Sequence, residues 1–138
     1  MTTDTFVEAI LDEYDNSTGR HLKAGERAAS REFIVADVPH DDLGREVSAK
    51  LAALIIHRSL QRLTDEKDDD WGQARQFKDI YDCRVCANAV AQVSVKGILE
   101  PVSKDEFGMT RILSDEELKK AVLRVFDGSK RVTNLLGF

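Results

Sequence analysis

Residues 51–56, a run of six apolar side chains, constrain the fold of this chain more than any other segment. The run is far too short to cross a bilayer, so we expect it inside a folded core. A helix that is apolar nearly all round packs against neighbours on several sides. We therefore predict a central helix that Asp41 or Asp42 caps and that continues to about Leu63. His57 follows the run directly, and we expect it to lie at the edge of the core.

Apolar residues recur at helical spacing in four further segments, 5–14, 25–36, 82–96 and 114–126. We therefore predict an all-α fold, a compact bundle of about five helices with short extended stubs at most. The clearest stub is at residues 77–80. The side chains expected to face the core are Phe6, Ala9, Ile10, Leu11, Ala29, Phe33, Ile34, Val85, Cys86, Ala89, Val90, Val93, Leu118, Val122, Val125 and Phe126.

The ends of the predicted helices have recognisable signals. Residues 15–19 have the composition of a turn and should end the first helix. Gly97 is suited to a left-handed cap at the end of the 82–96 helix. Ser114 and Glu117 have the S-x-x-E spacing of a capping box, which should start the last helix.

The composition is that of one folded domain covering residues 1–138. With 42% apolar residues, the chain can bury a core. Its net charge of −5 and pI near 5.2 argue against nucleic acid or an anionic membrane as the main partner. Neither a secretion signal nor a membrane-spanning segment is visible, so we expect no membrane insertion. The expected location is the cell surface if a leader has been removed, and the cytoplasm otherwise.

Two segments outside the predicted helices have distinctive composition. Residues 64–72 form an acidic connector, whose charges should repel one another and keep it solvated and mobile. Trp71 either anchors this connector to the core or faces a ligand, and we favour the anchor. Residues 129–138 form a flexible tail, whose Leu135, Leu136 and Phe138 either dock on the body or contact a partner.

Two acidic segments approach calcium-site patterns without completing them. Residues 15–26 have the length of an EF-hand loop, but Arg20 occupies the position that requires glycine and Gly19 lies one place early. The consecutive carboxylates of residues 68–70 lack the alternating spacing that a loop site needs. We therefore expect no metal and no cofactor.

Cys83 and Cys86 are too few for a disulfide framework. We expect buried structural thiols, because Cys86 shares a helix face with Val90 and Val93. A redox pair at the start of a helix capped by Asp82 is one alternative. Zinc binding is the other, although it needs two more ligands than the pair supplies.

A longer pattern extends from residue 77 to 126. It combines Phe77, Asp79 and Ile80, a helix with small and apolar positions, Gly97-Ile98, Phe107, and the helix start at Leu113 to Glu117. The spacing resembles the surface-layer homology (SLH) repeat, a module by which bacteria attach proteins to cell-wall polymers. A partial second copy begins near residue 43 and extends to about 63. The resemblance implies a helical binding module whose partner is a cell-wall glycan.

The resemblance also implies where a ligand would bind. In the family, the second helix begins with a cation that faces the acidic polymer, but Asp115 occupies that position here. Arg45 keeps the cation in the partial copy, with Lys50 nearby. The candidate ligand-binding residues are therefore Arg45, Lys50 and Trp71.

Catalysis is not expected, because no Ser/His/Asp or Cys/His arrangement can be proposed from the spacing. The expected function is that of a non-catalytic interaction module with an SLH-like helical fold, with a cell-wall polymer as its partner. The alternative is a cytosolic all-α adaptor or regulator that binds another protein.

Overall fold

A bundle of helices makes up the molecule, as predicted. The computed structural model describes residues 1–132, and among these residues it contains helices and turns but no strand. The predictions for residues 133–138, which include the apolar tail positions 135, 136 and 138, lie outside the described residues. The main helices are α1 (Thr3–Thr18), α2 (Ala24–Ile34), α3 (Ala49–Ser59), α4 (Ala87–Val95) and α5 (Asp115–Phe126).

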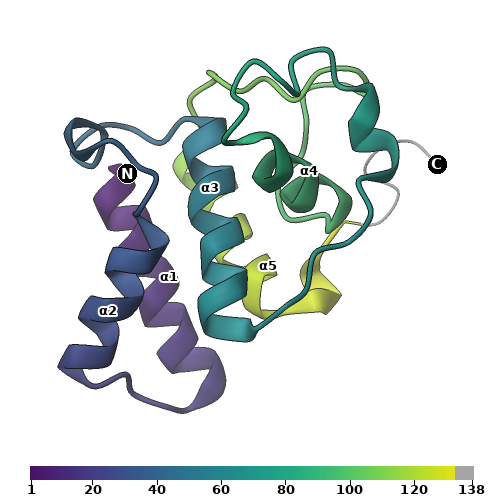
Figure 1. The fold of residues 1–138 in the computed structure, drawn as a ribbon. Coiled ribbons are helices and arrows are strands. Elements are labelled where there is room, and N and C mark those ends of the chain that lie inside the picture. The colour runs from purple at the N-terminus through teal and green to yellow at the C-terminus, as the bar shows by residue number, and fades with distance from the viewer. Residues whose placement is uncertain (133–138) are drawn as a thin grey trace.

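The predicted central helix is α3, which lies between the α1–α2 pair and α4 (Figure 1). Ile55 and Ile56 are completely buried, and Leu51 and Leu54 nearly so. The helix contacts α1, α2 and α4, which explains why its apolar residues occupy almost the whole circumference. After Ser59 the chain continues as a π-helical turn, η2 (Leu60–Thr64), so the predicted end near Leu63 is close to the end of the helical backbone.

The predicted start of α3 is wrong. Asp41 and Asp42 lie in a separate 3₁₀ turn, η1 (His40–Asp42). The N-cap of α3 is Ser48, whose hydroxyl accepts a hydrogen bond from the amide of Leu51 at 3.4 Å. A hydroxyl in extended backbone just before the helix satisfies one of its free amides, which the earlier aspartates cannot reach.

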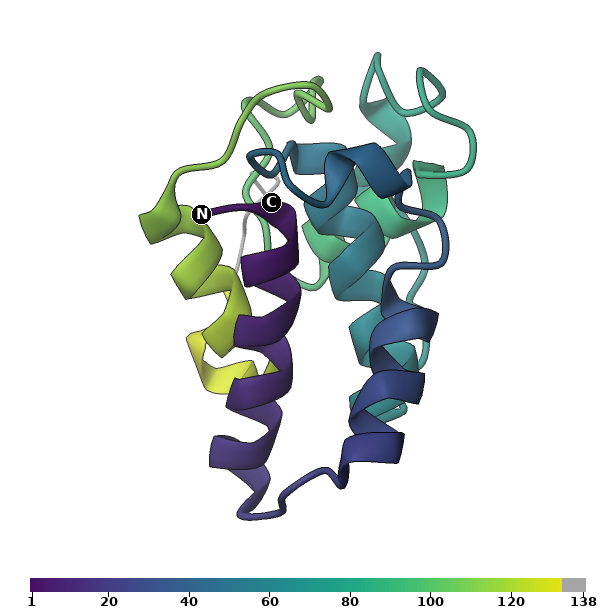
Figure 2. The ribbon, with the colours of Figure 1, turned by 90° about the vertical axis from the view of Figure 1, so that its left-hand side faces the viewer.

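Helices α1 and α2 form a hairpin, with α5 lying beside α1 (Figure 2). α1 continues through the predicted turn as far as Thr18, and Gly19 ends it with a left-handed φ of 68°. Arg27 links the two helices through ion pairs to Glu8 at 2.6 Å and Asp12 at 2.9 Å. Ala29, predicted to face the core, is exposed, and Ser30 is buried instead.

The segment before α4 differs from the prediction. Residues 77–80 form turns rather than an extended stub, and the regular helix begins at Ala87 instead of residue 82. Val85, predicted to face the core, is 67% exposed because it lies in the turn that precedes the helix. The predicted cap at the other end is confirmed, since Gly97 has a φ of 72°.

The predicted start and buried face of α5 are confirmed. Ser114 and Glu117 form the reciprocal capping box. Leu118, Val122 and Val125 are buried on the side that faces the bundle, whereas the fourth predicted position, Phe126, is only partly buried. The next segment includes a short 3₁₀ turn, η4 (Gly128–Lys130), after which the backbone amide of Val132 donates to the carbonyl of Gly97 at 3.0 Å.

Candidate functional site

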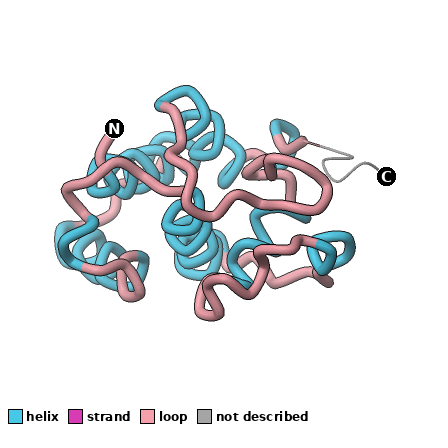
Figure 3. The backbone as a smooth tube through the Cα atoms, turned by 90° about the horizontal axis from the view of Figure 1, so that it is seen from above, coloured by secondary structure: helices cyan, strands magenta, loops and turns pink. Residues whose placement is uncertain are grey.

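Loops rather than helices cover one end of the bundle, as the view from above shows (Figure 3). The first two amides of α3, those of Ala49 and Lys50, donate to the carbonyls of Arg111 and Met109 at 2.9 and 3.0 Å. The amide of Leu113 donates to the carbonyl of Val47 at 2.9 Å. These bonds satisfy the free amides at the helix start and fix the 109–113 loop against it.

This pairing creates an open groove at the start of α3. The groove has a volume of about 650 Å³. Two of the three predicted ligand-binding residues, Arg45 and Lys50, line it. The complete lining is Asp42, Gly44, Arg45, Glu46, Ser48, Lys50, Leu51, Thr110 and Ile112. We call this set the α3 groove.

The α3 groove combines an exposed cation, Arg45, and a half-buried one, Lys50, with an apolar surface. The side chain of Arg45 is 73% exposed and makes only a long contact of 3.4 Å with Asp42. Lys50 has no ion pair with any of residues 1–132. Ile112 is 53% exposed at the edge of the groove. The acidic groups of Asp42 and Glu46 line the same groove, so its charge is mixed rather than uniformly positive.

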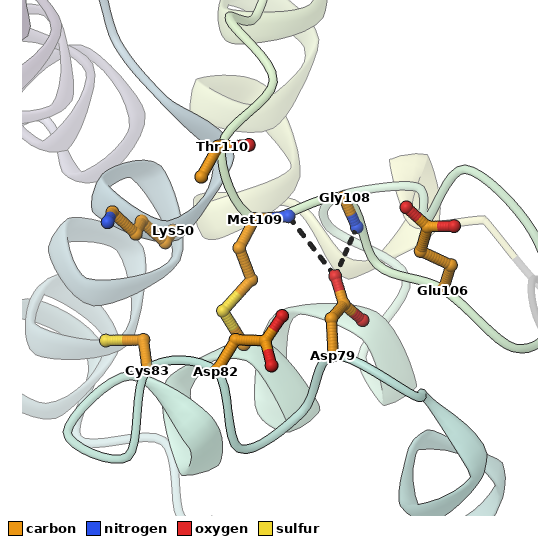
Figure 4. Close-up of a pocket in the computed structure, with 8 residues that line it drawn as sticks. All are labelled: Lys50, Asp79, Asp82, Cys83, Glu106, Gly108, Met109 and Thr110. Carbon is orange, nitrogen blue, oxygen red and sulfur yellow. Dashed lines mark hydrogen bonds between the residues drawn. The ribbon is translucent and has the colours of Figure 1, made fainter.

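A smaller pocket adjoins the α3 groove and shares Lys50 and Thr110 with it (Figure 4). Its volume is about 170 Å³. The other lining residues are Asp79, Asp82, Cys83, Glu106, Gly108 and Met109. We call it the Cys83 pocket.

Asp79 holds one wall of the Cys83 pocket in place. Its carboxylate accepts hydrogen bonds from the amides of Phe107, Gly108 and Met109 at 3.0, 2.8 and 3.3 Å. Gly108 has a φ of 81°, a conformation that suits glycine. Asp79 therefore supports the loop that carries Thr110 and Ile112 into the groove. The sequence analysis included Asp79 in the SLH-like pattern but did not predict that its carboxylate supports this loop.

The third predicted ligand-binding residue, Trp71, does not line the α3 groove. Its indole N–H donates to Asn88 Oδ1 at 2.9 Å, and its ring centroid lies 6.3 Å from that of Tyr81. Trp71 is partly buried against the core. This position matches the anchoring role favoured from the sequence.

The acidic connector packs against α4 through ion pairs, contrary to the expectation that its charges only repel one another. The side chain of Lys96 is 3% exposed, and its ammonium contacts Glu66 at 2.8 Å and Asp69 at 3.2 Å. Lys96 also donates to the carbonyl of Lys67 at 2.7 Å. Arg131 binds the Glu66 carboxylate through two hydrogen bonds of 2.7 and 2.9 Å. We call Glu66, Asp69, Lys96 and Arg131 the Lys96 cluster.

The Lys96 cluster affects the titration of Glu66. Hydrogen bonds from Arg131, and then from Lys96, lower the pKa of Glu66 although partial burial opposes them. This cluster was not predicted from the sequence, because a lysine at the end of an apolar helix usually reaches solvent.

The other connector carboxylates also have partners. Asp68 accepts from His57 at 2.7 Å and from Asn88 at 2.9 Å. Burial raises the pKa of Asp68, but the hydrogen bonds from Asn88 and His57, together with the charges of His57 and Lys96, lower it further, so the net shift is downward. Asp70 forms an ion pair with Arg75 at 2.7 Å. Among residues 1–132, no group of three or more His, Cys, Asp or Glu side chains is arranged to hold a metal ion.

Cys83 and Cys86 form a disulfide, with their Cα atoms 5.2 Å apart. The expectation of two structural thiols is therefore wrong. Cys86 is 2% exposed, as predicted from its helical face. Cys83 is only partly buried and lines its pocket.

Asp115, which occupies the cation position of the SLH pattern, forms an ion pair with the N-terminal ammonium of Met1 at 2.7 Å. A hydrogen bond from that ammonium lowers the pKa of Asp115. Asp115 is not among the residues that line the α3 groove.

Comparison with known protein families, curated proteins and solved structures finds no match to this chain. Within residues 1–132, none of the helices has both the length and the apolar character needed to cross a bilayer.

Proposed function

We propose that this protein is a non-catalytic binding module of SLH-like design that holds an anionic segment of a bacterial cell-wall glycan in the α3 groove. The observation that carries the proposal is the placement of Arg45 and Lys50 on one open groove, although five positions separate them in the sequence. Their side chains can pair with two acidic groups of one polymer chain.

The other groups in the groove suit a sugar ligand. The Ser48 and Thr110 side chains supply hydroxyls, and exposed Ile112 supplies an apolar surface for the face of a sugar ring. A site that combines apolar contact with a few fixed polar groups is typical of small-ligand binding. Asp42 and Glu46 restrict the anionic groups of the ligand to positions beside the two cations, because they repel negative charge elsewhere in the groove.

Sedimentation with purified cell-wall sacculi tests the proposal. We expect wild-type protein to sediment with the sacculi and to be released as salt increases, since exposed ion pairs are screened. An exposed ion pair contributes about 0.2–1 kcal/mol, so Arg45→Ala and Lys50→Ala should each weaken binding roughly two- to fivefold. The double variant should weaken binding about tenfold.

The matched control is Lys67→Ala, which removes one positive charge from a side chain that is 84% exposed on the connector. It should bind sacculi as the wild type does. Equal losses in Lys67→Ala and Lys50→Ala would show that only net charge matters. Unchanged binding in the double variant would reject the α3 groove as the site.

Binding to another protein is the second candidate, and exposed apolar side chains favour it. Tyr81 is 65% exposed and Val85 is 67% exposed, both within the turns that precede α4. Protease treatment of a cell-envelope fraction separates the two candidates. Retention that survives the treatment and depends on Arg45 supports a glycan. Retention that protease abolishes, and that Tyr81→Ser with Val85→Ser also abolishes, supports a protein partner.

A further inference from the structure

The Cys83–Cys86 disulfide closes a very short loop, with a sequence separation of only 3. Bonds that close short loops restrict the unfolded chain less than bonds that close long ones. The bond therefore has more influence on the local backbone than on the stability of the whole molecule. Cys83 is only partly buried and lines an open pocket, whereas Cys86 is 2% exposed, so Cys83 is the half of the disulfide that lies nearer to solvent.

The backbone around the disulfide is a series of tight turns rather than an α-helix. The amide of Cys86 donates to the carbonyl of Cys83 at 3.1 Å, and that of Ala87 to the carbonyl of Arg84 at 3.3 Å. These bonds join residues three apart, whereas α-helical bonds join residues four apart. The amino-acid pattern nevertheless favours a helix from residue 82, with Asp82 positioned as its cap.

Val85 has an apolar side chain, yet this turn leaves it 67% exposed to solvent. Its exposed side chain lines a hollow with Leu54 and Ala89, which belong to α3 and α4. In a continuous α-helix, residues four apart stack on the same face, so Val85 would lie over buried Ala89. A longer α4 would therefore gain both backbone hydrogen bonds and apolar burial.

We propose that Cys83 and Cys86 form a reversible thiol–disulfide site. In the oxidised form the bond stops α4 at Ala87, and in the reduced form α4 extends back to residue 82. The reductant is a thiol that enters the Cys83 pocket. This proposal does not depend on glycan binding.

Reduction proceeds by two exchange steps. The thiolate of an external thiol attacks Cys83 Sγ, so a mixed disulfide forms while the Cys83–Cys86 bond breaks. Cys86 Sγ leaves with the electron pair and takes up a proton. It lies at the N-terminus of α4, where the helix dipole stabilises the departing thiolate. A second external thiol then attacks the external sulfur and releases Cys83 as a thiol, so two thiols become one disulfide.

The acidic side chains of the Cys83 pocket should favour cationic thiols over anionic ones as reductants. Asp82 and Glu106 line it, and Lys50 is the cation opposite them. Asp79 is already bound by three backbone amides. Asp82 and Glu106 form no ion pair within residues 1–132, and their carboxylates repel an anionic thiol. Cysteamine should therefore reduce the bond several-fold faster than glutathione at equal thiolate concentration. Asp82→Asn together with Glu106→Gln should reduce this difference.

The test uses the oxidised protein under native conditions. Cysteamine or dithiothreitol should expose two thiols, counted as the mass added by a maleimide. Amide hydrogen exchange at Asn88 and Ala89 should then slow about tenfold, because a helix from residue 82 gives these amides the carbonyls of Arg84 and Val85 as partners. Far-ultraviolet circular dichroism should show added helix. Oxidised glutathione should reverse both changes. The double variant Cys83→Ser, Cys86→Ser should show the reduced exchange pattern and ignore the reductant.

Two results would overturn the proposal. One is a disulfide that external thiols reduce only as fast as the whole protein unfolds, which would make the bond purely structural. The other is rapid reduction with the same exchange rates at Asn88 and Ala89 in both forms. The exchange of α5, far along the chain, is the internal reference, because it should be identical in both redox states.

Discussion

At the scale of single residues, stability depends on a few positions where a buried charge or a left-handed backbone angle makes substitution costly. Lys96 is one of them, because its ammonium is buried and three oxygen-bearing groups surround it. Gly97, the next residue, is another. The two adjoin at the end of α4, where the connector and the segment after α5 meet.

Lys96→Met keeps the apolar stem and removes the ammonium. Asp69 then loses its cation, and Glu66 keeps only Arg131. Breaking one side of a buried pair costs about 3–5 kcal/mol, and partial exposure of the acids reduces this to about 2–3 kcal/mol here. Urea unfolding measures the loss. The matched variant Lys67→Met, at an exposed pair, should change stability by less than about 0.5 kcal/mol.

Gly97→Ala should destabilise the protein by about 2 kcal/mol or more, because φ is 72° and a Cβ would lie 2.1 Å from the carbonyl oxygen of Val132. Thermal unfolding measures the effect. Gly25→Ala is the control, since no atom lies within 4 Å of its Cβ position and it is inside α2. That change should raise stability by about 0.5–1 kcal/mol. A Gly97→Ala protein as stable as the wild type would contradict the assigned cap.

At the scale of elements, the loops depend on side chains that hydrogen-bond to backbone amides which have no backbone carbonyl as acceptor. Asp79 is the main example, because a single carboxylate organises residues 107–109. The loop in turn supplies the carbonyls that accept from the first amides of α3. A substitution of Asp79 should therefore alter the α3 groove through the loop, although Asp79 does not line the groove.

Asp79→Ala should cost about 2–3 kcal/mol, because partly buried amides lose a charged acceptor. It should also speed amide exchange at Ala49 and Lys50, which bond to the loop. Exchange measured by mass spectrometry checks this. Asp105→Ala is the control in the same loop, since its carboxylate contacts only Ser103 and exposed Lys78. Exchange at Ala49 that is unaffected by Asp79→Ala would show that the loop is held by other contacts.

The elements also show how far the sequence predicts the fold. The apolar pattern and the caps at Gly97 and Ser114 depend on neighbours in the chain, so they predicted the buried centre of α3, the end of α4 and the start of α5. The start of α4 was missed because residues 83–87 form turns whose hydrogen bonds join residues three apart, beside a Cys83–Cys86 disulfide that the sequence analysis did not predict. The connector was missed because the partners of its charges, Lys96 and Arg131, lie far along the chain. The role of Arg45 and Lys50 in ligand binding stays a prediction; both line one groove, but the loop that completes this groove is a long-range contact that the sequence does not reveal.

At the scale of the whole molecule, paired carboxylates determine the response to acid. The pKa values of Glu66, Asp68 and Asp115 are all lowered in the folded state. A lowered pKa means that the folded state binds the proton less readily than the unfolded state. The stabilisation is complete above the ordinary pKa and is lost as pH falls through the lower folded value.

The free energy of unfolding should therefore decrease as pH falls below about 4.5, the ordinary pKa of Glu66. Glu66→Gln should lower stability at neutral pH and flatten this decrease, because one titrating group is removed. Urea unfolding from pH 7 to pH 3 measures both effects. Glu116→Gln is the control, since this carboxylate is 80% exposed on α5 and its removal should leave the slope unchanged. A steeper slope in Glu66→Gln would contradict the direction of the shift.

The pairing between the start of α3 and the 109–113 loop also affects the order of assembly during synthesis. Ser48 and Ile112, which form an antiparallel bridge, are separated by nearly half of the 138-residue chain. Contacts between distant segments form after local ones, because closing a long loop costs entropy before it gains contacts. A nascent chain can thus complete the α1–α2 hairpin on the ribosome while the α3 groove is still absent. Any ligand of that groove meets only a chain that has been synthesised past residue 113.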